Sequence, residues 1–102
     1  MPNRPNFFIV GAPKCGTTAM HHYLRQHPNI FMPLDKEPSY FHVHYETPNF
    51  QRYRGNLAKY LSLFEPVTTE TRIGEASPGY IYSDIAADEI YDFDPNAKII
   101  IM

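Results

Sequence analysis

Residues 7–18 read Phe7-Phe8-Ile9-Val10-Gly11-Ala12-Pro13-Lys14-Cys15-Gly16-Thr17-Thr18. The stretch begins with a short apolar run that includes β-branched residues and ends at a glycine, which is typical of a buried strand. A loop between Gly11 and Gly16 follows, and Thr17 or Thr18 can cap a helix after it. A strand, a tight turn and a helix start in this order are typical of α/β proteins.

The same loop has the composition of an anion-binding site. Gly11 and Gly16 permit a turn in which backbone N–H groups converge, and the helix N-terminus adds the positive end of its dipole. Lys14 contributes a full positive charge, and Thr17 and Thr18 contribute hydroxyl donors. We therefore expect a phosphate or sulfate-like group to bind here. A glycine turn with structural threonines is the simpler alternative.

Outside this loop, helix and strand signals alternate along the chain. Apolar residues at three- and four-residue spacing predict a helix ended by Pro28, a second ended by Pro66, and a third that begins at Ser83 or Asp84 and continues through Tyr91. The residues expected to face inward are Ala19, Met20, Tyr23, Leu24 and His27 in the first helix and Ala86, Ala87, Ile90 and Tyr91 in the third. Strand-like runs lie at residues 29–32, 73–75 and 98–102, and Ser77-Pro78 opens a turn or a helix. This order predicts a P-loop-like α/β fold with three layers and a central parallel sheet.

The last apolar run, Ile99-Ile100-Ile101-Met102, reads as a buried parallel strand. Such a strand is normally followed by a loop and a covering helix, and the 102-residue sequence contains neither after it. We therefore expect residues 1–102 to be the N-terminal part of one larger domain, with an incomplete sheet truncated after this strand.

Composition excludes several classes of protein. The 9 Lys and Arg residues and 11 Asp and Glu residues give a net charge of -2, which argues against nucleic-acid binding. One cysteine cannot form an internal disulfide, and no apolar run is long enough to span a membrane. With no secretory signal either, we expect a cytoplasmic chain. The sequence does not indicate an oligomeric state.

The loop departs in one respect from the nucleoside-triphosphate P-loop that it resembles. Gly11 and Gly16 keep the spacing of that motif, but Thr17 stands where the P-loop requires lysine. The lysine is inside the loop, at position 14, and no acidic residue follows the last strand to hold magnesium. We therefore expect no metal at the site.

Three segments resemble the PAPS-dependent sulfotransferases, in particular their carbohydrate (heparan-type) branch and its bacterial relatives. PAPS denotes 3′-phosphoadenosine 5′-phosphosulfate. The first segment is Gly11–Thr18 with the following Leu24–Ile30, and it resembles the 5′-phosphosulfate loop of the family. The second is Lys36-Glu37-Pro38-Ser39-Tyr40-Phe41, which resembles the family motif K-E-P-x-x-F. The third is Gly74-Glu75-Ala76-Ser77-Pro78-Gly79-Tyr80, which resembles the family motif G-E-K-[ST]-P-x-Y. Their order and approximate spacing are those of the family.

The resemblance implies transfer of a sulfuryl group from PAPS to a hydroxyl or amine acceptor, a glycan among the candidates. Residues Pro13, Lys14, Cys15, Gly16, Thr17 and Thr18 would bind the donor. Lys14 would neutralise charge on the leaving phosphate, and Glu37 would be the general base. Lys36, Glu75 and Ser77 are weaker candidates for contacts to the substrate.

Two departures from the family pattern bear on this expectation. Ala76 stands where the carbohydrate branch usually has a lysine, so one cationic contact is missing or comes from elsewhere. The family's 3′-phosphate site would lie beyond Met102, so we expect the 102 residues alone to be inactive.

Five alternatives follow from the same residues. The loop is also compatible with a P-loop nucleotide kinase-like enzyme or with a non-catalytic nucleotide-binding fragment. Nucleophilic chemistry at Cys15 is disfavoured, because a phosphatase-type loop needs an arginine where His21 stands. His42, His44 and Glu46 would share one face of an extended segment and suggest a weak metal site. His21 or His22 would be an alternative base if its side chain faced the loop.

Overall fold

The computed structural model describes residues 3–11, 16–35, 37–41, 43 and 53–102. Its elements in chain order are β1 (Phe7–Gly11), α1 (Thr17–Arg25), β2 (Ile30–Phe31), α2 (Leu57–Ser62), β3 (Arg72–Ala76), the 3-10 helix η1 (Pro78–Tyr82), α3 (Ala86–Phe93) and β4 (Lys98–Ile101). The strands and helices expected from the sequence are all present, with shorter bounds at several ends. Pro78 stands at the first position of η1, as Ser77-Pro78 predicts.

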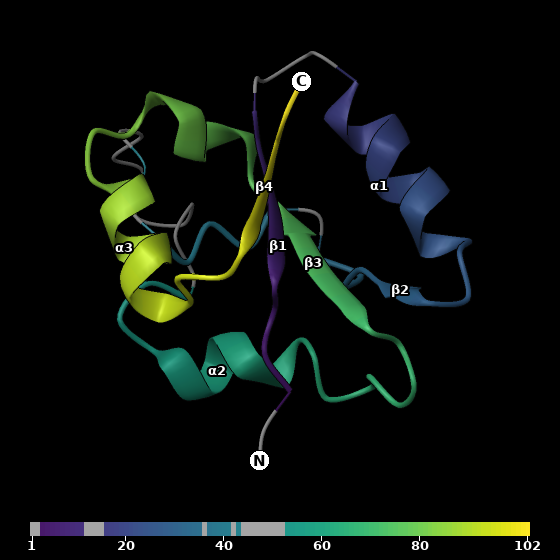
Figure 1. The fold of residues 1–102 in the computed structure, drawn as a ribbon. Helices are drawn as coiled ribbons and strands as arrows, with labels where there is room; N and C mark the ends of the chain where they lie inside the picture. The colour runs from purple at the N-terminus through teal and green to yellow at the C-terminus, as the bar shows by residue number, and fades with distance from the viewer. Residues whose placement is uncertain (1–2, 12–15, 36, 42, 44–52) are drawn as a thin grey trace.

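The four strands form one sheet in the order β2-β3-β1-β4 (Figure 1). All three pairings are parallel, and Phe7 of β1 lies between Gly74 of β3 and Lys98 of β4. The predicted parallel sheet is confirmed. Because the strands run in one direction, β1, β3 and β4 bring their carboxyl ends to the same edge of the sheet.

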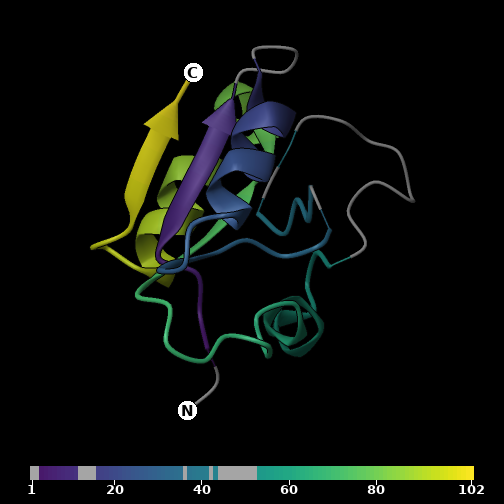
Figure 2. The same ribbon diagram turned by 90° about the vertical axis from the view of Figure 1, so that its right-hand side faces the viewer.

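The side chains of β1 alternate between two apolar layers. Phe8 and Val10 pack on the side of α3, against Ala86 and Ile90. On the opposite side, the core consists of Phe7, Ile9, Met32 and Ala76, with Met20, Leu24, Ile30 and Ile100 packed against it. Figure 2 shows α1 and α3 on opposite sides of the sheet. The arrangement confirms the expected three-layer α/β fold.

Two helix faces differ from the prediction. Tyr23 of α1 is 71% exposed, whereas His21 is buried and its Nε2 lies 2.9 Å from the carbonyl oxygen of Pro33. In α3, Ala86 and Ile90 are buried as expected, but Tyr91 is 65% exposed. In both helices, fewer apolar side chains are buried than the three- and four-residue spacing predicts, because each helix packs against a single neighbouring layer.

Within residues 1–102, β4 lies at the end of the strand order and is largely exposed. β4 pairs with β1 alone, and Ile99 and Ile101 are 47% and 67% exposed. A largely apolar cavity of about 340 Å³ lies beside β4, and its lining includes Val10, Ile90 and Ile101. The prediction of a parallel strand is therefore confirmed, and its exposure agrees with the expectation that no covering helix follows it within residues 1–102.

Candidate functional site

The end of β1 is enclosed by two neighbouring elements. The backbone N–H of Met102 donates to the carbonyl oxygen of Gly11 at 2.8 Å. A Cβ built on Gly11 would lie 2.5 Å from Cγ2 of Ile81 and 3.0 Å from the carbonyl oxygen of Pro78, and the φ of Gly11 is +154°. Position 11 therefore requires a glycine, because η1 packs directly on the backbone where the predicted loop begins.

The loop ends at a helix start that is suited to an anion. Gly16 caps α1 with φ 85° and ψ 15°, in the left-handed region, and its carbonyl oxygen accepts from the N–H of Met20 at 3.0 Å. In the described part of the chain, no side chain caps α1 and its first turn has no acidic residue. The expectation that Thr17 or Thr18 caps the helix is therefore wrong. The positive end of the helix dipole faces the loop without a neutralising carboxylate.

Several predicted site residues lie outside the described residues. They are Pro13, Lys14, Cys15 and Lys36. Their proposed contacts with a donor or an acceptor stay predictions. The structure does describe the backbone at both ends of the loop, Gly11 and Gly16, and the segment that carries Glu37.

Glu37 lies at the surface, directly before the buried residues Pro38 and Ser39. Partial desolvation of its carboxyl group, and then the negative charge of Asp35, raise the pKa of Glu37 above its usual value. A raised pKa makes a carboxylate a better proton acceptor near neutral pH, which is what a general base requires.

Glu75 lies entirely inside the protein, at the end of β3, with 0% of its surface exposed. Its Oε1 accepts from the hydroxyl of Ser77 at 2.6 Å, and its Oε2 accepts from the hydroxyls of Tyr80, at 3.0 Å, and of Tyr60. Burial raises the pKa of Glu75 to about 7, although these three hydrogen bonds act in the opposite direction. Glu75 and Ser77, the weaker candidates for substrate contacts, both bond to protein groups here.

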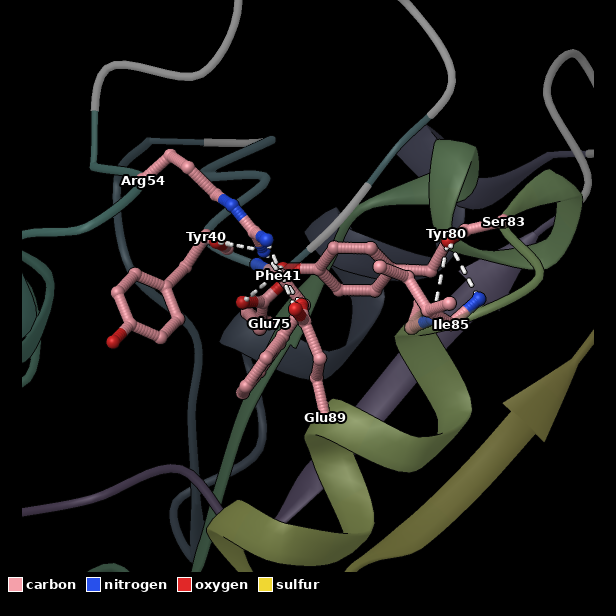
Figure 3. Close-up of polar contacts among 9 residues, drawn as sticks. Tyr40, Phe41, Arg54, Glu75, Tyr80, Ser83, Ile85 and Glu89 are labelled. Carbon is pink, nitrogen blue, oxygen red and sulfur yellow. Dashed lines mark hydrogen bonds and ion pairs between the residues drawn. The ribbon is translucent and has the colours of Figure 1, made fainter.

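The segment after Glu37 is attached to this buried cluster. The backbone N–H of Ser39 donates to Oγ of Ser77 at 2.9 Å, and that of Phe41 donates to the hydroxyl of Tyr80 at 3.3 Å. Figure 3 shows Glu75, Phe41 and Tyr80 close together. Sequence reasoning missed Tyr60 and gave Tyr80 no role. A glutamate between Gly74 and Ala76 in a predicted strand was the available signal, because a buried carboxylate requires hydrogen-bond donors.

A protein-family model described as "Sulfotransferase family" matches residues 5–56. This chain belongs to the sulfotransferase family. A solved sulfotransferase structure from Alicyclobacillus acidocaldarius is similar, with a TM-score of 0.85 and 40% sequence identity, and the match covers 98% of this chain and 44% of that one. The family resemblance and the α/β fold expected from the sequence are both confirmed.

Two curated relatives extend this comparison. The membrane-associated sulfotransferase kil1 of Dictyostelium discoideum is 35% identical, over 96% of this chain and 20% of its own length. Human heparan sulfate glucosamine 3-O-sulfotransferase 6 is 36% identical, over 96% of this chain and 26% of its own length. This sulfotransferase chain therefore spans about a fifth to a quarter of the length of these two relatives.

The expectation of a cytoplasmic chain is wrong, because kil1 is a membrane-associated sulfotransferase. The absence of an apolar segment from a stretch of sequence does not define where a protein resides. In the regions that the structure describes, no helix of this sulfotransferase is long and apolar enough to cross a bilayer.

Among the residues that the structure describes, the histidines do not form a second site. His21 is a buried residue bonded to Pro33, which favours a structural role over that of an alternative base. His42, His44 and Glu46 lie outside the described residues. Among the residues that are described, no three His, Cys, Asp or Glu side chains are grouped as metal ligands.

Proposed function

We propose that this chain carries the donor-binding loop and the general base of a PAPS-dependent sulfotransferase. The reaction moves the sulfuryl group of PAPS to a hydroxyl or amine of an acceptor. The observation that carries the proposal is the start of α1: Gly16 caps it in a left-handed conformation, and its first turn has no acidic residue. Membership of the sulfotransferase family supports this assignment of the anion site.

On the donor side, the N–H groups at the start of α1 bind the 5′-phosphate, together with the loop residues Pro13 to Thr18. Lys14 lies against the oxygen that bridges phosphorus and sulfur. As the S–O bond breaks, the ammonium group of Lys14 neutralises the charge that develops on the leaving phosphate. A sulfuryl group carries less charge than a phosphoryl group, so this mechanism uses one lysine and N–H donors without a metal.

On the acceptor side, Glu37 removes the proton of the attacking hydroxyl or amine as the new bond to sulfur forms. The raised pKa of Glu37 suits this role. Lys36 contacts the acceptor or the transferred group. The acceptor is a carbohydrate, by analogy with the relatives named as heparan sulfate glucosamine 3-O-sulfotransferase 6 and carbohydrate sulfotransferase 15.

The proposal is tested in the protein at its full natural length. Binding of 3′,5′-ADP is measured by calorimetry in the presence of a chelator, and transfer from labelled PAPS is measured with a panel of glycan acceptors. We expect binding without metal, and we expect Lys14→Ala to abolish transfer. The matched control is Lys98→Ala, which removes an exposed lysine at the opposite end of β4. A strict requirement for magnesium, or full transfer by Lys14→Ala, would overturn the proposal.

A further inference from the structure

The buried cluster around Glu75 is hydrogen-bonded to the backbone of Ser39 and Phe41, which follow Glu37 in the chain. Two separate hydrogen-bond chains lead from the backbone of this loop to the two oxygens of one carboxyl group. The first chain runs from the N–H of Ser39 to Oγ of Ser77 and on to Oε1 of Glu75, with distances of 2.9 and 2.6 Å. The second runs from the N–H of Phe41 to the hydroxyl of Tyr80 and on to Oε2, with distances of 3.3 and 3.0 Å.

The direction of these hydrogen bonds suits the ionised form of Glu75, which predominates above its pKa of about 7. A hydroxyl has one proton to donate, and the oxygens of Ser77 and Tyr80 already accept from backbone N–H groups. Both hydroxyl protons therefore point toward Glu75. An ionised carboxyl group accepts both, and it also accepts from the hydroxyl of Tyr60. A neutral side chain that must itself donate cannot keep all of these bonds.

The conformation of the loop explains why such an anchor is needed. Ser39 has a φ of 51°, in the left-handed region that non-glycine residues seldom adopt, and it is completely buried. Its N–H must be satisfied inside the protein, and Ser77 provides an acceptor. Ser39 is two residues from Glu37, so the geometry at Ser39 sets the direction from which the carboxylate of Glu37 leaves the loop.

We propose that Glu75 is a positioning residue, which acts through Ser77 and Tyr80 to hold Glu37 in place for removal of the acceptor proton. The inference rests on the proposed sulfuryl transfer and assigns a new role to Glu75. Instead of contacting the substrate, Glu75 connects the end of β3 and the start of η1 with the backbone of residues 39–41. A general base displaced by about 1 Å can lose up to 10²-fold in rate, so the connection affects catalysis from a distance.

Two tyrosines provide a matched pair of variants for the test. Tyr60 and Tyr80 are both buried, and their hydroxyls bond to the same oxygen, Oε2 of Glu75. Only Tyr80 is also bonded to a backbone N–H of the 39–41 segment in the described structure. Tyr60→Phe and Tyr80→Phe therefore remove the same group from the same carboxylate and differ in the connection to the loop. Ser77→Ala is a second, smaller change that breaks the other chain.

The first measurement is steady-state kinetics of the full-length protein with PAPS and an acceptor glycan. We expect Tyr80→Phe and Ser77→Ala to lower kcat about 10-fold or more, and Tyr60→Phe to change it less than about 2-fold. The affinity for 3′,5′-ADP should stay the same in all three variants, because none of the removed hydroxyls bonds to Gly11 or Gly16, the described ends of the proposed donor loop. Equal kcat values for the two Tyr→Phe variants would overturn the inference.

The second measurement is amide hydrogen exchange, which does not depend on activity. Tyr80→Phe should accelerate exchange at Phe41, and Ser77→Ala should accelerate exchange at Ser39, whereas Tyr60→Phe should affect neither. If the unmodified protein transfers no sulfuryl group, the proposed function fails and the exchange data still test the anchor. Unchanged exchange in both Tyr80→Phe and Ser77→Ala would show that the cluster does not hold the loop.

Discussion

The backbone N–H of Met102 donates a 2.8 Å hydrogen bond to the carbonyl oxygen of Gly11. The bond joins the ends of β4 and β1, the two strands at one side of the sheet. On another side of Gly11, η1 lies so close that a Cβ would collide with Ile81. The residue from which the proposed donor loop departs is therefore held by backbone and side-chain contacts from two elements.

We expect Gly11→Ala to lower the free energy of unfolding by about 2–3 kcal/mol, because the added methyl group overpacks the junction. The Cβ would lie 2.5 Å from Cγ2 of Ile81 and 3.0 Å from the carbonyl oxygen of Pro78. Urea denaturation measures the change. The double variant Gly11→Ala/Ile81→Ala should be less destabilised than the sum of its single variants, since part of the collision is removed. Strictly additive losses would contradict the packing argument.

Gly16→Ala should weaken nucleotide binding beyond its effect on stability. The φ of Gly16 is +85° and that of Gly55 is +77°. Among the described residues, a Cβ at Gly55 would have no neighbour within 4 Å, and a Cβ at Gly16 would meet Met102 alone, at 3.9 Å. Each substitution to alanine should cost about 1–2 kcal/mol of stability, from the left-handed conformation alone. Calorimetry with 3′,5′-ADP should show weaker binding for Gly16→Ala and no change for Gly55→Ala. Equal affinities of the two variants for 3′,5′-ADP would show that the start of α1 does not contribute to nucleotide binding.

The order of strands and helices could be predicted from the sequence, because each element carries a local signal. The run from Phe7 to Gly11 marks a buried strand, and Pro28 and Pro66 mark helix ends. The cap of α1 could not be predicted from residue preferences. Thr17 is the better capping residue in isolation, but the turn needs a positive φ at position 16, and that places the glycine at the cap.

The buried polar groups were harder to predict because their partners are distant in the sequence. His21 is buried through its contact with Pro33, which no helical periodicity encodes. Glu75 accepts hydrogen bonds from the hydroxyls of residues 60, 77 and 80, and these hydroxyls come together only in the folded protein. Family resemblance indicated the loop and Glu37, and the structure was needed to show how Glu75 connects to that segment.

Glu37→Gln should lower kcat by about 10² or more with little change in nucleotide affinity, because an amide cannot accept the acceptor proton. Glu65→Gln, which changes an exposed glutamate after α2, is the control. Asp35→Asn should move the acidic limb of the pH–rate profile to lower pH, since the charge of Asp35 contributes to the raised pKa of Glu37. Unchanged turnover in Glu37→Gln would exclude Glu37 from the mechanism.

The stability of the folded protein should depend on pH through Glu75. The pKa of Glu75 is about 7 in the folded protein and about 4.5 in the unfolded chain. Between these values the folded protein keeps a proton that the unfolded chain has lost, so the free energy of unfolding falls as pH rises from about 4.5 to about 7. The full loss is about 3 kcal/mol. Below this window both states are protonated, and above it both are ionised, so the slope vanishes on either side.

The groups that act on the Glu75 carboxyl are the hydroxyls of Tyr60, Ser77 and Tyr80 and the carboxylate of Asp35. Burial raises the pKa of both tyrosines well above its usual value, so neither titrates in the window. The raised pKa of Glu37 also makes the free energy of unfolding fall as pH rises. Chemical denaturation between pH 4.5 and 8 is therefore compared in Glu37→Gln and in the double variant Glu37→Gln/Glu75→Gln. The slope should be largely lost in the double variant. A slope that persists in the double variant would show that Glu75 does not cause it and has a pKa near the ordinary value of 4.5. The hydrogen bonds from Ser77 and Tyr80 would then be made to an ionised carboxylate over most of this pH range.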